Sequence, residues 1–147
     1  MVAGVALILA AGITVVTDDI VQIVPFRQQS ITRMNQAKNW ATALRIYANT
    51  HGNQLPGNFA QLFAQFGQPA AGLSETNWEI VSGGKLPSAH PSQTILLREK
   101  EARQSPRGEF VKAYAFADGH AELIRSPDKD FAALEKQRGF LAQPAMN

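Results

Sequence analysis

The sequence contains no cysteine and no block of basic residues. The lack of cysteine among its 147 residues excludes disulfide bonds, thiolate metal ligands and a cysteine nucleophile. The formal net charge is only +2, and the basic residues are spread along the chain from Arg27 onward. The electrostatic signature of a nucleic-acid-binding protein is therefore missing. A chain of this length is sufficient for one domain with its own hydrophobic core.

Motifs of common catalytic families are also absent. The chain has neither a Gly-x-Ser-x-Gly elbow nor a His-Glu-x-x-His helix. The stretch from Ser82 to Lys85 lacks the first glycine and the following Ser or Thr of a phosphate-binding loop, and we interpret it as a turn. We therefore expect a protein without enzymatic activity.

The amino-terminal segment has no charged residue before Asp18. As a helix, residues 2–16 would span roughly 22 Å, which is shorter than the ~30 Å hydrocarbon core of a bilayer. Asp18 and Asp19 interrupt the apolar character, which then resumes through residues 20–26. We expect residues 1–24 to form a membrane-anchoring helix, with both aspartates at the outer interface. A buried core helix is the alternative.

A long amphipathic helix is predicted after Pro25, a residue suited to opening or kinking a helix. Apolar residues recur there at intervals of three and four, the spacing of one helical face: Ile31, Met34, Ala37, Ala41, Leu44 and Ala48. Trp40, Ala43 and Tyr47 widen this face. Gly52 is expected to end the helix, and Pro56 prevents its continuation.

The remainder of the chain predicts short strands between two short helices. Asn58 is expected to cap the first helix, over residues 59–66. Runs of apolar or β-branched residues, typical of strands, occupy 77–82, 94–100, 109–117 and 120–126. Ser126 and Pro127 are expected to begin the second helix, which Gly139 would end.

The order of these elements indicates an α+β domain over residues 25–147. We expect a long N-terminal helix packed on a small antiparallel sheet of three or four strands, followed by a short C-terminal helix. Because so small a sheet is unstable alone, the long helix is expected to cover its apolar face. Asp118 and Gly119 are typical of a two-residue hairpin turn, in which glycine readily supplies a positive φ.

The same hairpin carries groups that could hold a metal ion. On a strand, His120 and Glu122 point to one face, and Asp118 lies across the turn. Such oxygen ligands suit calcium, and Glu99 and Glu101 on the neighbouring strand could add carboxylates. The alternative is a solvated turn in which Asp118 and Gly119 serve the backbone geometry alone. No obligatory cofactor is expected.

Two stretches resemble bacterial type IV pilin-like proteins, especially the pseudopilins of type II secretion. The first is Pro25 followed by FRQQSITRMNQAKNWATALRIYANTHGNQLP, and the second is LREKEARQSPRGEFVKAYAFADGHAELI, residues 97–124. The second resembles a processing-associated pseudopilin domain with an Asp-Gly-His strand-turn-strand. The resemblance implies a non-catalytic protein-transport subunit of a filament, methylated after processing. It also implies a single-pass protein of the bacterial inner membrane with its C-terminal domain in the periplasm.

Other pilin-like subunits are the partners that this resemblance implies, in a homo- or hetero-oligomer with heterologous contacts. Five residues of the long helix are candidate subunit contacts: Ile31, Met34, Trp40, Leu44 and Tyr47. The alternative is a stand-alone, membrane-tethered module that binds calcium or a small ligand through the 99–122 hairpin without polymerising. The sequence departs from the family at three points: the Gly-Phe-Thr-Leu-Ile-Glu processing signal is missing, no acidic residue precedes Asp18 in the apolar run, and Gly108 occupies the position of the family's hallmark histidine. The missing processing signal favours the alternative.

Overall fold

A computed structural model describes the backbone of residues 2–67 and 74–142. Side chains are described for residues 21–67 and 74–142. The predicted membrane-anchoring segment, residues 1–24, therefore lies almost wholly outside the described side chains. Over the residues whose side chains are described, no helix is both long enough and apolar enough to cross a bilayer.

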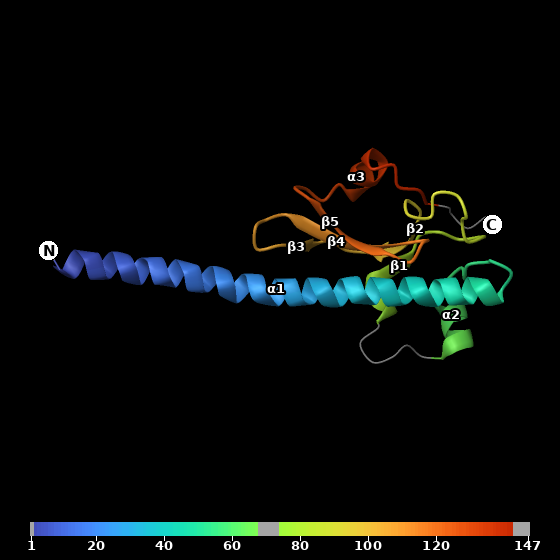
Figure 1. Cartoon of the computed structure of the whole chain (residues 1–147), viewed down its shortest axis with the longest axis horizontal. Coiled ribbons are helices and arrows are strands. Elements are labelled where there is room, and N and C mark those ends of the chain that lie inside the picture. Colours follow the sequence, from blue (N-terminus) through green and yellow to red (C-terminus); the bar gives the residue numbers. More distant parts are fainter. Residues whose placement is uncertain (1, 68–73, 143–147) are drawn as a thin grey trace.

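The domain has three layers, with one antiparallel sheet between two helices (Figure 1). Helix α1, Val2–Thr50, lies against one face of the sheet, and helix α3, Phe131–Gln137, lies against the other. Helix α2, Phe59–Phe66, packs on α1 through Trp40, whose ring is 5.0 Å from that of Phe59. The expected α+β class, with a long N-terminal helix on an antiparallel sheet and a short C-terminal helix, is confirmed.

Helix α1 continues through Pro25 without a break. The interpretation of Pro25 as a helix start is therefore wrong: proline removes only one backbone hydrogen bond, and the bonds of the adjacent turns preserve the helix. The predicted end is confirmed. Gly52 has a φ of 61°, and the Asn53 N–H donates to the Ala48 carbonyl at 2.8 Å, which satisfies a carbonyl of the last turn.

Four main strands form an antiparallel meander in chain order, close to the predicted ranges. They are β1 (Trp78–Ile80), β2 (Ile95–Glu99), β4 (Phe110–Phe116) and β5 (Ala121–Ser126). Because β4 lies between β2 and β5, it is the strand most enclosed by the domain, and it is buried on both faces.

A fifth strand, β3 (Arg103–Gln104), lies between two of the predicted strand ranges and was not predicted. It pairs with β4 at Val111, and Val111 also pairs with Arg125 of β5. β3 therefore lies on the same side of β4 as β2, beyond the end of that strand. The sheet thus contains five strands but is four strands wide.

Small residues line the interface between α1 and the sheet. Ala37, Ala41 and Ala48 of α1 and Ala113 and Ala115 of β4 are all fully buried in one core cluster. Because the side chains of these alanines end at Cβ, the helix backbone can approach the strand closely. Leu44 and Leu97 occupy the same cluster and fill the space beside these alanines.

Large aromatic residues line the opposite face of β4. Side chains alternate along a strand, so Tyr114 and Phe116 point away from α1. They form a second cluster with Ile124 and with Phe131 of α3. Phe140, which follows α3, packs edge-on against Phe116 with ring centroids 5.0 Å apart. The sheet therefore buries both faces, although only the cover by the long helix was expected.

The hairpin between β4 and β5 turns at Asp118 and Gly119, as expected, but its loop is longer than two residues. The Phe116 N–H donates to the His120 carbonyl at 3.0 Å, which leaves Ala117, Asp118 and Gly119 in the loop. Only Gly119 has a positive φ, 93°. This is the three-residue arrangement in which a turn is followed by a left-handed glycine, so the two-residue prediction was wrong.

The predicted start of α2 is confirmed, and the predicted start of α3 is wrong. Asn58 caps α2 as predicted, accepting a hydrogen bond from the Gln61 N–H. The helix start predicted at Ser126 and Pro127 is wrong, because Ser126 ends β5. The cap of α3 is Asp130, whose side chain accepts from the Ala133 N–H at 3.0 Å.

Glu99 joins the sheet to α1 through a buried carboxylate. Its side chain is 1% exposed, and one carboxylate oxygen accepts from Arg33 Nη1 at 2.6 Å. The other oxygen accepts from the Ala113 backbone N–H at 2.8 Å. A buried carboxylate destabilises a fold unless it is paired and hydrogen-bonded. The position of Arg33, and with it the rotation of α1, is therefore constrained by Glu99.

Replacing Arg33 with methionine would remove the closer of the two guanidinium groups beside this buried carboxylate and leave only Arg103, whose Nε lies 4.0 Å from Glu99 Oε1. We expect Arg33→Met to lower the free energy of unfolding by about 2–4 kcal/mol, toward the lower end for buried pairs because Arg33 is partly exposed. Urea denaturation of the full chain measures the change. Lys38→Met, at an exposed position of the same helix, is the control and should stay within about 0.5 kcal/mol. Equal effects of the two substitutions would contradict the role given to the pair.

Candidate functional site

The predicted metal ligands do not converge in the hairpin. Asp118 Oδ1 lies 2.5 Å from His120 Nδ1 and also accepts from the His120 backbone N–H at 3.0 Å. Glu122 instead accepts from Arg138 Nη1 at 2.9 Å. Within the described part of the chain, no three His, Asp or Glu side chains are grouped as metal ligands. Glu99 is engaged beneath α1 by Arg33 and adds nothing to the hairpin.

Asp118 and His120 instead form a local contact that fixes the hairpin tip. Partial burial acts to raise the pKa of the Asp118 carboxyl, but hydrogen bonds from the backbone and ring of His120 outweigh it, so the pKa lies below its ordinary value. The His120 ring stacks on Phe116 with centroids 4.3 Å apart. Arg45 of α1 donates to the Asp118 carbonyl at 3.0 Å, which ties the tip to the long helix.

A network of charged and polar side chains connects α3 to the sheet. Arg98 donates to Glu79 and, at 2.6 Å, to Glu135 of α3. The Tyr114 hydroxyl donates to Glu135 at 2.7 Å. Burial, together with this bond, raises the pKa of Tyr114 far above its ordinary value. Every member has a partner within the network, so its role is structural.

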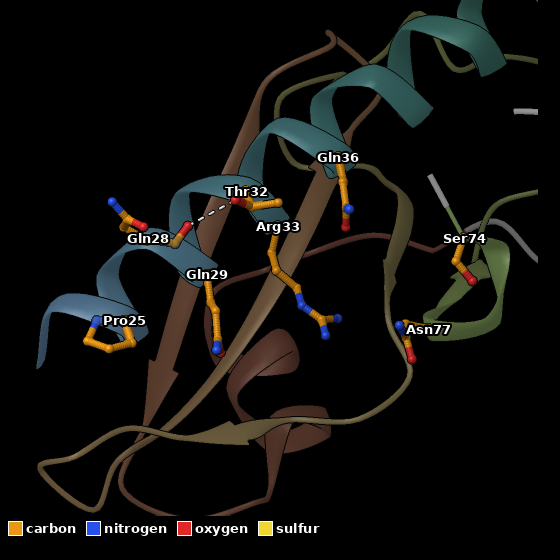
Figure 2. A pocket seen from close by; sticks show the side chains of 8 residues that line it. All are labelled: Pro25, Gln28, Gln29, Thr32, Arg33, Gln36, Ser74 and Asn77. Carbon is orange, nitrogen blue, oxygen red and sulfur yellow. Dashed lines mark hydrogen bonds between the residues drawn. The ribbon is translucent and has the colours of Figure 1, made fainter. Parts of the chain in front are cut away.

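A polar cavity of about 500 Å³ lies between α1 and the 3₁₀ helix η1, Glu75–Asn77. In Figure 2, Gln29 and Arg33 extend from α1 toward this space, and Asn77 borders it from the other side. Amides, hydroxyls and one guanidinium make up its polar lining, with no carboxylate or imidazole among the described residues. Such a lining offers hydrogen bonds to a polar group but provides no acid–base pair for catalysis.

This cavity was not predicted from the sequence, because its two walls are about forty residues apart in the chain. The sequence shows several glutamines on α1, but these predict a cavity only once the position of the opposite wall is known. Arg33 belongs to both the cavity and the buried pair with Glu99.

The five predicted subunit contacts divide between the core and the surface. Trp40 and Leu44 are buried in this chain's own core. Tyr47 packs partly against the same cluster, and Met34 is half-buried. Ile31 is 55% exposed. Of the five, Ile31 is therefore the one whose side chain is fully available to a neighbouring molecule.

A different apolar surface lies on the side of α1 turned away from the sheet. Val21, Val24, Ile31 and Ile46 are all exposed. At 3.6 residues per turn they fall within an arc of about 80°, opposite the alanines that face β4. The full arc, about 100° wide, carries no charged residue. We call it the outer face of α1, and it comprises Val21, Val24, Gln28, Ile31, Thr32, Asn35, Asn39, Thr42, Ile46, Asn49 and Thr50.

The three threonines of the outer face have satisfied hydroxyl groups. Thr32 donates to the Gln28 carbonyl at 3.0 Å, and Thr42 donates to the Lys38 carbonyl at 2.9 Å. Thr50 donates to the Tyr47 carbonyl at 2.9 Å. Because these hydroxyls bond within their own helix, a neighbour that packed on this face would leave none of them without a partner.

No protein-family model matches the chain, and no curated protein or solved structure matches it either. The observed arrangement, an N-terminal helix packed on an antiparallel sheet, is compatible with the pilin-like fold that the sequence resembles. What the protein does is therefore inferred from its own surfaces.

Calcium is expected to leave the melting temperature unchanged, because Asp118 is held by His120 and Glu122 by Arg138. A ligand that binds only the native state must raise the melting temperature. Differential scanning calorimetry of the full chain, first with EDTA and then with excess calcium, measures the shift. A calcium-dependent rise that is lost in Asp118→Asn would instead support a calcium site at the hairpin.

The lowered pKa of Asp118 predicts a pH-dependent contribution to stability. Such a carboxyl stabilises the folded chain above its ordinary pKa of about 4, and the contribution is lost as pH falls through the lower folded pKa. We therefore expect Asp118→Asn to lower the urea midpoint at neutral pH and to match the parent protein in acid. Glu101→Gln, at an exposed position with no ion pair among the described residues, is the control. Parallel pH profiles for the parent and Asp118→Asn would contradict this role.

Proposed function

We propose that the protein is a non-catalytic, membrane-anchored, pilin-like subunit of a secretion or pilus-type assembly. In this proposal it resides in the bacterial inner membrane with its C-terminal domain in the periplasm. The observation that carries the proposal is the outer face of α1, an uncharged and partly apolar helical surface on the side opposite the sheet.

The length of α1 supports an anchoring role. Figure 1 shows α1 extending past the edge of the sheet toward the amino terminus. Ahead of the two aspartates the helix rises roughly 22 Å at 1.5 Å per residue, which is most of the ~30 Å hydrocarbon core of a bilayer, and it leaves Asp18 and Asp19 at the outer interface. A helix needed only to cover this small sheet would not require that extension.

The outer face supports contact between helices of neighbouring subunits. Its exposed valines and isoleucines would bury apolar area, and the internally bonded threonines would add no desolvation penalty for their hydroxyls. Helix α2 borders only the C-terminal end of this face, where Gln65 Nε2 donates to the Thr50 hydroxyl at 3.0 Å. A neighbour could therefore pack on the face from Val21 to Ile46 without disturbing the domain core. A contact between this face and a different surface of the next subunit would repeat along a filament.

The alternative function, a membrane-tethered binding module that does not polymerise, is favoured by one observation. The cavity beside Arg33 has the volume of a small-ligand pocket, about 500 Å³. Its amides and hydroxyls would suit a polar, uncharged ligand. The two functions differ in whether copies of the chain associate through the outer face. The pilin-like subunit requires this association, and the binding module does not.

Cysteine crosslinking tests the assembly directly, since the natural chain has no cysteine. We expect Ile31→Cys and Ile46→Cys to form crosslinks to neighbouring subunits in native membranes, because both side chains are exposed on the outer face. Each cysteine is labelled with a benzophenone maleimide and irradiated, and gel electrophoresis measures the yield of crosslinked subunits. Benzophenone reacts with whatever surface it touches, so the neighbouring subunit needs no cysteine of its own.

Lys85→Cys, exposed on a loop outside α1, is the matched control. Adding Asn35→Asp to Ile31→Cys should reduce the yield, because it places a charge in the proposed contact. Equal yields at positions 31 and 85, or none at any position, would contradict assembly through the outer face.

A further inference from the structure

A second cavity, of about 250 Å³, lies where α1 leaves the sheet. It is bordered by Ile23 and Phe26 of α1, by the turn between β3 and β4, and by Arg125 of β5. Figure 1 shows that turn beside α1, at the end of the domain from which the helix extends. The cavity is thus at the junction between the domain and the helix extension.

The charged groups of this cavity are all basic. Arg27, Arg107 and Arg125 line it, and its described lining includes no carboxylate. Arg125 pairs with nearby Glu109 at 3.2 Å. Arg27 and Arg107 have no ion-pair partner among the side chains that the structure describes. The cavity therefore carries an excess of positive charge even after the Glu109 pair is counted.

Ser105 adds a buried hydroxyl without a partner. The residue is 7% exposed, lines the cavity, and its Oγ has no hydrogen-bond partner among the described atoms. The turn does not require this hydroxyl, because the Ser105 backbone already donates to the Glu109 carbonyl at 2.7 Å and accepts from the Gly108 N–H at 2.9 Å. The Ser105 Oγ is enclosed in the present arrangement, so the side chain would have to rotate to present this hydroxyl to the cavity. A buried polar group left unpaired destabilises the fold, so a ligand that accepts the hydrogen bond would favour that rotation.

The apolar side of the cavity determines what kind of anion fits. Ile23, Phe26 and Pro106 line the same cavity as the guanidinium groups, so its lining is amphipathic. A phosphate ester with an apolar tail matches both sides, since arginine forms paired hydrogen bonds with phosphate oxygens. A free phosphate ion would use only the polar side.

We propose that this cavity holds the phosphate of an anionic phospholipid headgroup, with Arg27, Arg107 and Ser105 as its donors. The proposal rests on the membrane anchoring proposed above. If α1 enters the bilayer before Gln22, then Ile23 and Phe26 lie at the level of the headgroups. The bound lipid would fix the height and tilt of the domain at the membrane surface.

Titration calorimetry of the full chain in nonionic detergent tests the site with three water-soluble probes. These are short-chain phosphatidylglycerol, the phosphatidylcholine of equal chain length, and inorganic phosphate. We expect phosphatidylglycerol to bind at least about tenfold more tightly than phosphatidylcholine, because the anionic headgroup is not self-neutralised. Inorganic phosphate binding as tightly as phosphatidylglycerol would overturn the lipid assignment in favour of a free-phosphate site.

Two variants test the named donors. Ser105→Ala should weaken phosphatidylglycerol binding by about tenfold, as for a hydrogen bond to a charged group. It should leave the melting temperature of the unliganded protein unchanged or higher, because its hydroxyl has no partner to lose among the described residues. Arg27→Gln with Arg107→Gln should abolish the preference over phosphatidylcholine. The double variant Lys85→Gln with Lys136→Gln removes the same charge from exposed positions elsewhere.

An equal loss of binding in this lysine control would overturn the site and indicate non-specific surface charge. Absence of any preference in the parent chain would do the same. Crosslinking through Ile31→Cys, measured on the same variants in membranes, separates this proposal from the proposed function. Crosslinks without a headgroup preference would defeat the lipid site alone, and a headgroup preference without crosslinks would defeat assembly alone.

Discussion

The close approach of α1 to the sheet is the constraint on which the rest of the structure depends. Alanines at positions 37, 41 and 48 face alanines 113 and 115 across the interface. Because protein interiors are densely packed, a larger residue at any of these positions would push the helix outward. The same close approach places Arg33 within reach of Glu99, so packing and charge pairing require one and the same helix position.

This arrangement separates the residues that hold the domain together from those available to other molecules. The inner face of α1 is committed to the sheet, and Trp40 is committed to α2. The outer face and the arginine-lined cavity near Ile23 contribute little to the core. Substitutions on these surfaces would therefore have little effect on the stability of the domain.

Much of the fold could be predicted from local chemistry, whereas the surfaces could not. The cap at Asn58 and the turn at Gly119 follow from properties of single residues, and the structure confirms their places. Ser126 satisfied the same capping rule, but strand pairing with Phe110 overrode it. Leu44 and Ile31 both belong to the same apolar pattern in the sequence. Only the position of the sheet shows that Leu44 is buried and Ile31 is exposed. The cavities join distant segments and leave no local pattern.

Pro25 lies inside an unbroken helix, and this has a mechanical consequence. Its ring nitrogen carries no hydrogen, so the carbonyl oxygen of Val21, one turn earlier, has lost its usual helical donor. Val21 is two-thirds exposed, so water can reach this turn of the helix. With one backbone hydrogen bond missing, the helix is expected to bend more readily here than at the turns on either side.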